Sequence, residues 1–94
     1  MVVSEFEHVV EQMHRALDAF FTGDSAPAKE LFSHGDGVTL ANPFGPVAHG
    51  WKQVAETMER AASHYRDGEA TGFERIVTCV TPELAYIVEV ERYK

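Results

Sequence analysis

Residues 84–93 read LAYIVEVERY, a run in which apolar and charged residues alternate. Successive side chains of a strand point to opposite faces, so Tyr86, Val88 and Val90 share one face and the two glutamates share the other. One face should therefore meet helices, while the other meets water or a partner. Such alternation does not suit a sheet covered on both faces, so it predicts an α+β fold with an antiparallel sheet.

The preceding sequence predicts helices first and a hairpin last. Apolar residues recur every three or four positions in three segments, and Thr81-Pro82-Glu83 reads as a hairpin turn between two β-rich runs. Ser4 and Glu7 form a capping box, which predicts that the first helix begins there. The helices are predicted over about residues 5–22, 26–32 and 51–65, and the strands over about residues 38–41, 71–80 and 84–93, with a Pro/Gly-rich loop over residues 42–50.

Composition limits the classes of partner and compartment. The chain has 94 residues, 45% of them hydrophobic, and a net charge of -7, which argues against nucleic acid or an anionic membrane as a partner. Cys79 is the only cysteine, which is typical of a reducing, cytoplasmic compartment. No apolar run reaches the length of a membrane span, and no cofactor or metal motif is present, so we expect none.

The end of the sequence leaves a predicted strand exposed. Residues 91–94 follow it directly, so few strands cover three helices and a long sheet edge is open. We therefore expect one domain over residues 1–94 that is incomplete at its C-terminus. The alternative is a homodimer, completed by strand exchange with a second copy.

Residues 42–45, Asn-Pro-Phe-Gly, carry a family resemblance. They are followed by His49-Gly50 and a predicted amphipathic helix, and preceded by FFTGD at residues 20–24 and VTL at residues 38–40. In this order the segments resemble the bacterial ketosteroid isomerases and their SnoaL-like relatives. The resemblance implies a cystatin-like cone, in which N-terminal helices pack on a curved, mainly antiparallel sheet that forms a half-barrel.

The resemblance also implies where chemistry would occur. In those isomerases an aspartate in the loop shuttles a proton, and a helix tyrosine hydrogen-bonds the enolate oxygen. The matching positions here are Asn42 and Ala16, which supply neither base nor donor, so they argue against steroid isomerisation. Asn42 can still orient a carbonyl or simply cap a turn, and His49 can act as an acid or base or be structural.

Other residues are candidates for a pocket wall or a buried base. Core packing is the commoner role of large apolar side chains. The pocket candidates are Ala16, Phe20, Phe32, Asn42, Phe44, Trp51, Met58 and Tyr65. The strand residues Glu74, Glu89 and Glu91 can include a buried general base, face solvent, or pair across the sheet with Arg75 or Arg92. His14 is interpreted as part of a solvated helix face.

Two functions follow from these observations. The first is binding of a small hydrophobic molecule in an internal pocket, with cofactor-independent isomerase, dehydratase or hydrolase chemistry. The second is non-catalytic homodimerisation through the sheet face. An open cavity lined by Asn42 and His49 would favour the first, and a pocket filled by its own side chains would favour the second.

Overall fold

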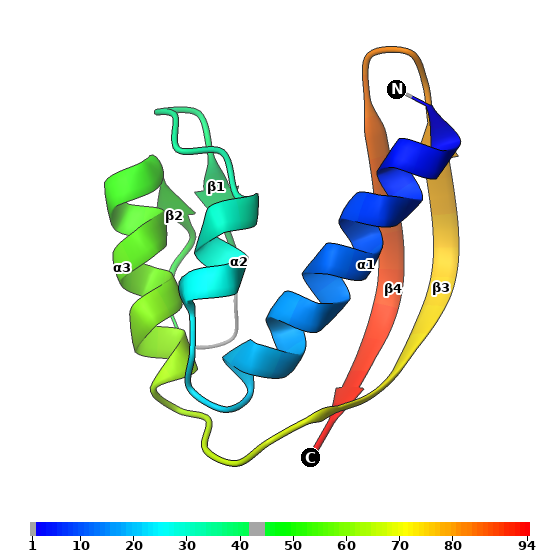
Figure 1. Ribbon diagram of the computed structural model, residues 1–94. Helices are drawn as coiled ribbons and strands as arrows, with labels where there is room; N and C mark the ends of the chain where they lie inside the picture. The colour runs from blue at the N-terminus through cyan, green and yellow to red at the C-terminus, as the bar shows by residue number, and fades with distance from the viewer. Residues whose placement is uncertain (1, 42–44) are drawn as a thin grey trace.

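The computed structural model describes residues 2–41 and 45–94, and it has helices at its start and a long hairpin at its end (Figure 1). The elements are α1 (Val3–Phe20), α2 (Ala26–Leu31), β1 (Thr39–Leu40), β2 (Ala48–His49), α3 (Trp51–Ala62), β3 (Ala70–Val80) and β4 (Ala85–Tyr93). The predicted α+β class is confirmed. The described strands form two separate two-stranded antiparallel sheets, β1–β2 and β3–β4, so the closed cone stays a prediction.

Helix α1 begins before the predicted capping box. Its N-cap is Val2, and no side-chain cap bond is found for it among the described residues, while Ser4 and Glu7 lie inside the helix. The predicted capping box is therefore wrong. Glu7 instead accepts a 2.5 Å bond from Arg75 Nη1 in β3, because a guanidinium is a stronger partner for a carboxylate than a backbone amide is.

Strand β2 lies inside the segment that was predicted to be a loop. Thr39 pairs with His49 and Leu40 with Ala48, so residues 48–49 extend the backbone alongside β1. Two residues are too few to show a period, so periodicity could not predict this strand. Gly50 then turns the chain into α3 with φ 84°, a conformation that side-chain-bearing residues rarely adopt.

Small residues form the core between the helices and the short sheet. Ala16 of α1, Ala28 of α2, Ala48 of β2 and Val54 and Met58 of α3 are all buried and pack as one cluster. Alanine lets neighbouring backbones approach closely, so α2, α3 and the β1–β2 sheet gather beside the C-terminal half of α1.

The β3–β4 hairpin lies along α1 (Figure 1), and the face that carries Arg75 and Glu89 contacts Glu7 and His14 of α1. Arg75 faces Glu89 across the hairpin, while Val77 faces Val88, with a register shift at Ile76. Residues directly opposite share a face, so one face carries Arg75 and Glu89 towards α1. We call the opposite side the outer face; its residues are Gly72, Glu74, Val77, Cys79, Tyr86, Val88, Val90 and Arg92.

The middle of the outer face is apolar and exposed, and the Glu74–Arg92 ion pair lies at one end of it. Tyr86, Val88 and Val90 retain 48%, 52% and 42% of their surface exposed. The alternation correctly predicted that only one face would meet a helix, but the face that meets α1 is the one that carries the glutamates.

An aromatic cluster joins the end of α1 to the end of β4. Phe21 is buried and stacks on Tyr93 at 4.4 Å between ring centroids, and Tyr65 meets both rings edge-on. The Gly68 backbone N–H donates to the Phe21 carbonyl at 3.0 Å. These contacts hold the start of β3 and the end of β4 beside the C-terminus of α1.

Candidate functional site

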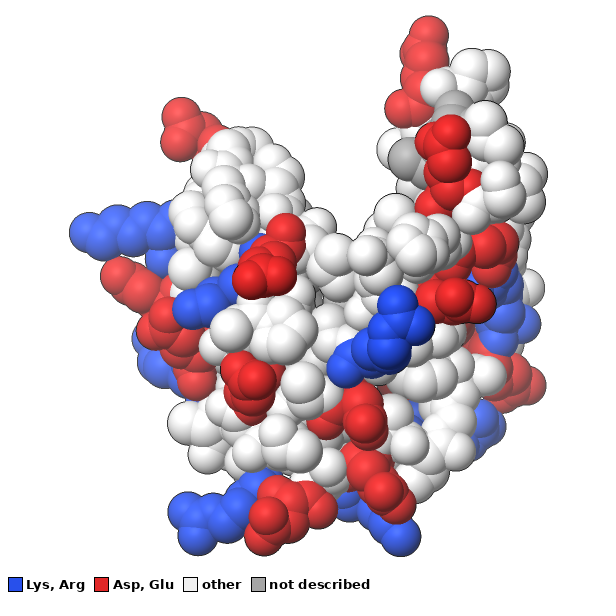
Figure 2. All heavy atoms as spheres, in the orientation of Figure 1, with Lys and Arg blue, Asp and Glu red and all other residues white. Residues whose placement is uncertain are grey.

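A hollow of ≈ 340 Å³ opens between α1, α2, β1, α3 and β4. Figure 2 shows the surface notched between the part that holds α2 and α3 and the arm that holds α1 and the hairpin. We call the space lined by these elements the apolar hollow, because most of its wall is hydrocarbon. Its main apolar walls are Met13, Leu17, Phe20, Phe32, Leu40 and Met58.

Helix α1 supplies one wall through its spacing. Met13, Leu17 and Phe20 are separated by four and three residues, so they lie on one side of the helix. The Phe20 ring meets Phe21 edge-on at 6.5 Å and lies tilted on Tyr65 at 5.7 Å, and all three residues line the hollow. The C-terminal half of α1, the short helix α2 and the short strand β1 thus line the same space.

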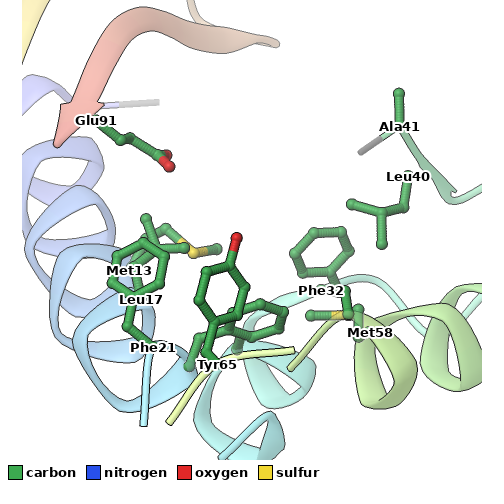
Figure 3. A pocket seen from close by; sticks show the side chains of 12 residues that line it. Met13, Leu17, Phe21, Phe32, Leu40, Ala41, Met58, Tyr65 and Glu91 are labelled. Carbon is green, nitrogen blue, oxygen red and sulfur yellow. The ribbon is translucent and has the colours of Figure 1, made fainter. Parts of the chain in front are cut away.

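Two polar groups project into the apolar hollow (Figure 3): the Tyr65 hydroxyl and the Glu91 carboxyl. Tyr65 follows α3, and its hydroxyl lies 3.5 Å from the Tyr93 hydroxyl. Burial raises the pKa of Tyr65 to about 12, helped by the Tyr93 hydroxyl and the charge of Glu91. The Tyr65 hydroxyl therefore keeps its proton at neutral pH, and it donates that proton to the Tyr93 hydroxyl.

Glu91 comes from the α1-facing side of β4. Partial burial raises the pKa of its carboxyl, the negative charge of Glu89 raises it further, and His14 acts in the opposite direction. A carboxyl with a raised pKa beside an apolar space can hold a proton, donate it, or accept one from a bound molecule.

Polar side chains of α1, β3 and β4 contact one another on the same side of the hairpin as Glu91. His14 Nε2 lies 2.5 Å from Glu89 Oε1, and the His14 ring stacks on Phe73 at 3.7 Å. Arg75 Nε is 4.0 Å from the other Glu89 oxygen. The interpretation of His14 as solvated is wrong, because β3 and β4 cover it. The predicted cross-strand pairing is confirmed for Arg75 with Glu89, and also for Arg92 with Glu74 at 3.1 Å.

The structure brings together part of the predicted pocket set. Four of those residues line the apolar hollow: Phe20, Phe32, Met58 and Tyr65. Ala16 is 2% exposed in the core, Trp51 stacks on His34 at 3.9 Å, and His49 is exposed on β2; none of these three is among the walls. Asn42 and Phe44 lie outside the described residues.

Sequence reasoning missed three of the six main apolar walls: Met13, Leu17 and Leu40. Met13 and Leu17 belong to the apolar positions that predicted the first helix, so the same spacing could have predicted them as wall residues. Which side of the helix meets a hollow depends on the packing of α2 and α3, for which periodicity gives no signal.

The described residues contain neither a metal site nor a helix that could span a membrane. Within residues 2–41 and 45–94, no three side chains of His, Cys, Asp or Glu gather into a possible metal site. Over the same ranges, no helix combines the length and apolar character needed to cross a membrane. No protein-family model, curated protein or solved structure matches the chain.

Proposed function

We propose that the chain binds a small, mainly apolar molecule in the apolar hollow. The observation that carries this proposal is a space of ≈ 340 Å³ with hydrocarbon walls and two inward polar groups, Tyr65 and Glu91. Small-molecule sites are typically apolar concavities of roughly 300–1,000 Å³ with a few placed polar groups. The resemblance of residues 13–51 to SnoaL-like proteins agrees with such a site and remains part of the proposal.

The packing around the apolar hollow supports a binding role over a purely structural one. Phe20 and Phe32 are only partly buried, and both border the hollow. Apolar surface gains roughly 25 cal/mol per Å² when it is removed from water, so binding of a ligand that covers these rings would be favourable.

Any reaction in the apolar hollow would depend on Glu91 and Tyr65. We propose that Glu91 is the acid or base of a cofactor-independent isomerase, dehydratase or hydrolase, with the Tyr65 hydroxyl as a polar contact for the bound molecule. Asn42 and His49 have no supporting geometry, since Asn42 is not described and His49 does not border the hollow. Proton transfer by a positioned carboxyl is the chemistry that this pair favours.

A thermal-shift screen tests binding. Steroids, polyketides and terpenoid epoxides should include compounds that raise the melting temperature, because a ligand that binds only the folded chain stabilises it. Leu17→Trp fills the hollow and should abolish the shift, whereas Val9→Trp, at an exposed position of the same helix, should retain it. No shift across the panel, or an unchanged shift in Leu17→Trp, would contradict the proposal.

The outer face supports a second candidate function, homodimerisation. The chain exposes 6268 Å², whereas a folded monomer of 10.5 kDa is expected to expose about 5,400 Å². The excess of about 800 Å² equals the share that one partner contributes to a standard protein interface. Val77, Tyr86, Val88 and Val90 would form its apolar centre.

Sedimentation at micromolar concentration tests this second candidate. The wild-type chain should be a dimer, and Val88→Lys should be a monomer because it places a charge in the apolar centre. Val47→Lys is the matched control, since Val47 is an exposed valine away from the outer face. A monomeric wild-type chain would contradict homodimerisation.

A further inference from the structure

A second hollow, of ≈ 250 Å³, lies between α3 and the residues that lead into β2. Four side chains of α3 line it: Gln53, Glu56, Thr57 and Arg60. They are spaced by three, one and three positions, so they share one face of the helix. No residue lines both this space and the apolar hollow. We call the second space the polar hollow.

Two opposite charges border the polar hollow without pairing. Glu56 and Arg60 are four residues apart, the spacing at which a helix commonly pairs opposite charges. Within the described part of the chain, however, neither side chain takes part in an ion pair. The polar hollow therefore presents a carboxylate and a guanidinium that are both available to a ligand.

Thr57 adds a buried hydroxyl to the polar hollow. The residue is 8% exposed, and its Oγ1 accepts a hydrogen bond from Arg60 Nη2 at 3.2 Å. Among residues 2–41 and 45–94, the Thr57 proton has no acceptor. Buried donors in folded proteins nearly always have an acceptor, so an oxygen of a ligand in the polar hollow would complete this one.

The remaining walls of the polar hollow are one amide and a hydrocarbon surface. Gln53 Oε1 accepts from the His49 backbone N–H at 3.2 Å, which leaves the Gln53 amide nitrogen as a further donor. Residues 46–48 are proline, valine and alanine, and they supply the apolar part of the wall. The site thus combines an anion partner, a cation partner and a small apolar surface.

We propose that the polar hollow binds a free α-amino acid with a small aliphatic side chain. The ligand carboxylate would pair with Arg60 and accept the Thr57 proton, and the ligand ammonium would pair with Glu56. The aliphatic side chain would lie against residues 46–48. An anion alone would meet the charge of Glu56, and a cation alone would meet that of Arg60, so the site requires both charges of the ligand.

Nuclear magnetic resonance titration of the isotope-labelled chain with L-valine at neutral pH tests the inference. Backbone amide signals of α3 and of residues 47–49 should shift and saturate. Two matched probes each lack one charge of L-valine: isovalerate lacks the ammonium, and isobutylamine lacks the carboxylate. Each should bind at least about tenfold more weakly than L-valine, the effect of losing one charge-assisted hydrogen bond.

Two variants and one control complete the design. Arg60→Gln should weaken L-valine binding at least about tenfold. Lys52→Gln removes the same charge from an exposed position of α3 outside the polar hollow and should bind as wild type. Thr57→Val should weaken L-valine about three- to tenfold without lowering the melting temperature, because an apolar group replaces a buried donor that has no acceptor. A purely structural Thr57 would change the melting temperature and leave the affinity unchanged.

The outcomes separate this inference from the proposed function of the apolar hollow. No saturable shift with L-valine, or equal binding of isovalerate, overturns the inference. If Lys52→Gln weakens L-valine as much as Arg60→Gln does, the effect is one of net charge and the inference also fails. Leu17→Trp fills the apolar hollow and should bind L-valine as wild type; loss of binding in this variant would place the amino acid in the apolar hollow and overturn the inference.

Discussion

Glu89 has an environment that its neighbours in the sequence do not suggest. It stands between two valines in β4, yet its side chain is 9% exposed, with His14 and Arg75 on either side of the carboxylate. Alternation placed Glu89 on one face of a strand, but the helix that covers this face is 75 residues away in the chain. A local sequence pattern cannot predict a contact between residues so distant, which is why the His14–Glu89 pair was missed.

His14→Ala should lower the free energy of unfolding by about 1–3 kcal/mol, because Glu89 would stay buried without its nearest partner. Urea unfolding followed by circular dichroism at pH 6–7 measures the change. His8→Ala is the matched control on the same helix, at an exposed position, and should change stability little. Equal losses in the two variants would show that the His14–Glu89 pair contributes nothing specific.

Glu91→Gln should raise the melting temperature at neutral and alkaline pH. A carboxyl with a raised pKa stabilises the fold while it is protonated, and that contribution is lost as the pH rises through the raised pKa. Glutamine does not ionise, so the melting temperatures of the variant and the wild type should converge in acid. They should separate once the pH exceeds the raised pKa of Glu91. Melting curves at several pH values provide the measurement, with Glu83→Gln as control. A variant that is less stable than wild type at alkaline pH would contradict the assignment.

At the scale of elements, the hairpin was the most predictable part. Its strands were predicted to within one residue at the ends, because turn residues and β-rich runs are local signals. The shift at Ile76 was not predicted: a bulge breaks alternation, so Ile76 is 56% exposed although it lies in an apolar run.

Thr81 fixes the turn of this hairpin. Its Oγ1 accepts from the Leu84 N–H at 2.9 Å, and its backbone N–H donates to the Leu84 carbonyl at 2.7 Å. Thr81→Val removes only the hydroxyl and should cost about 0.5–1.5 kcal/mol in chemical denaturation. Thr71→Val, at an exposed position of β3, is the control and should be neutral or stabilising. A neutral Thr81→Val would mean that the backbone alone holds the turn.

The candidate site was predictable only in part. Phe20, Phe32, Met58 and Tyr65 followed from their size and order in the chain, since large apolar residues gather wherever a core or pocket forms. Glu91 was only one of several strand glutamates, because alternation groups residues by face without showing which face is covered. The packing of α1 decides which face of β4 is covered. This packing depends on contacts between residues that are distant in the sequence, such as His14 and Glu89.

At the scale of the whole molecule, Gly68 lies where three segments meet. A Cβ there would lie 2.7 Å from the Phe21 carbonyl oxygen and 2.8 Å from that of Lys94, and backbone atoms can yield only by moving their segments. Gly68→Ala should therefore cost about 1–3 kcal/mol. Gly72→Ala is the control, because its Cβ would meet nothing within 4 Å. Equal unfolding free energies for the two variants would show that the junction relaxes without cost.

The outer face has a consequence for how the chain behaves in different buffers. Copies that carry a net charge of -7 repel one another over about 10 Å at 0.1 M salt, while contact between apolar side chains is not weakened by ions. Added sodium chloride should therefore strengthen self-association of this chain, whereas it weakens an association held by opposite charges. Ionic strength would then control the extent of the proposed homodimerisation, because the charged surface opposes contact between copies and the valines of β4 favour it.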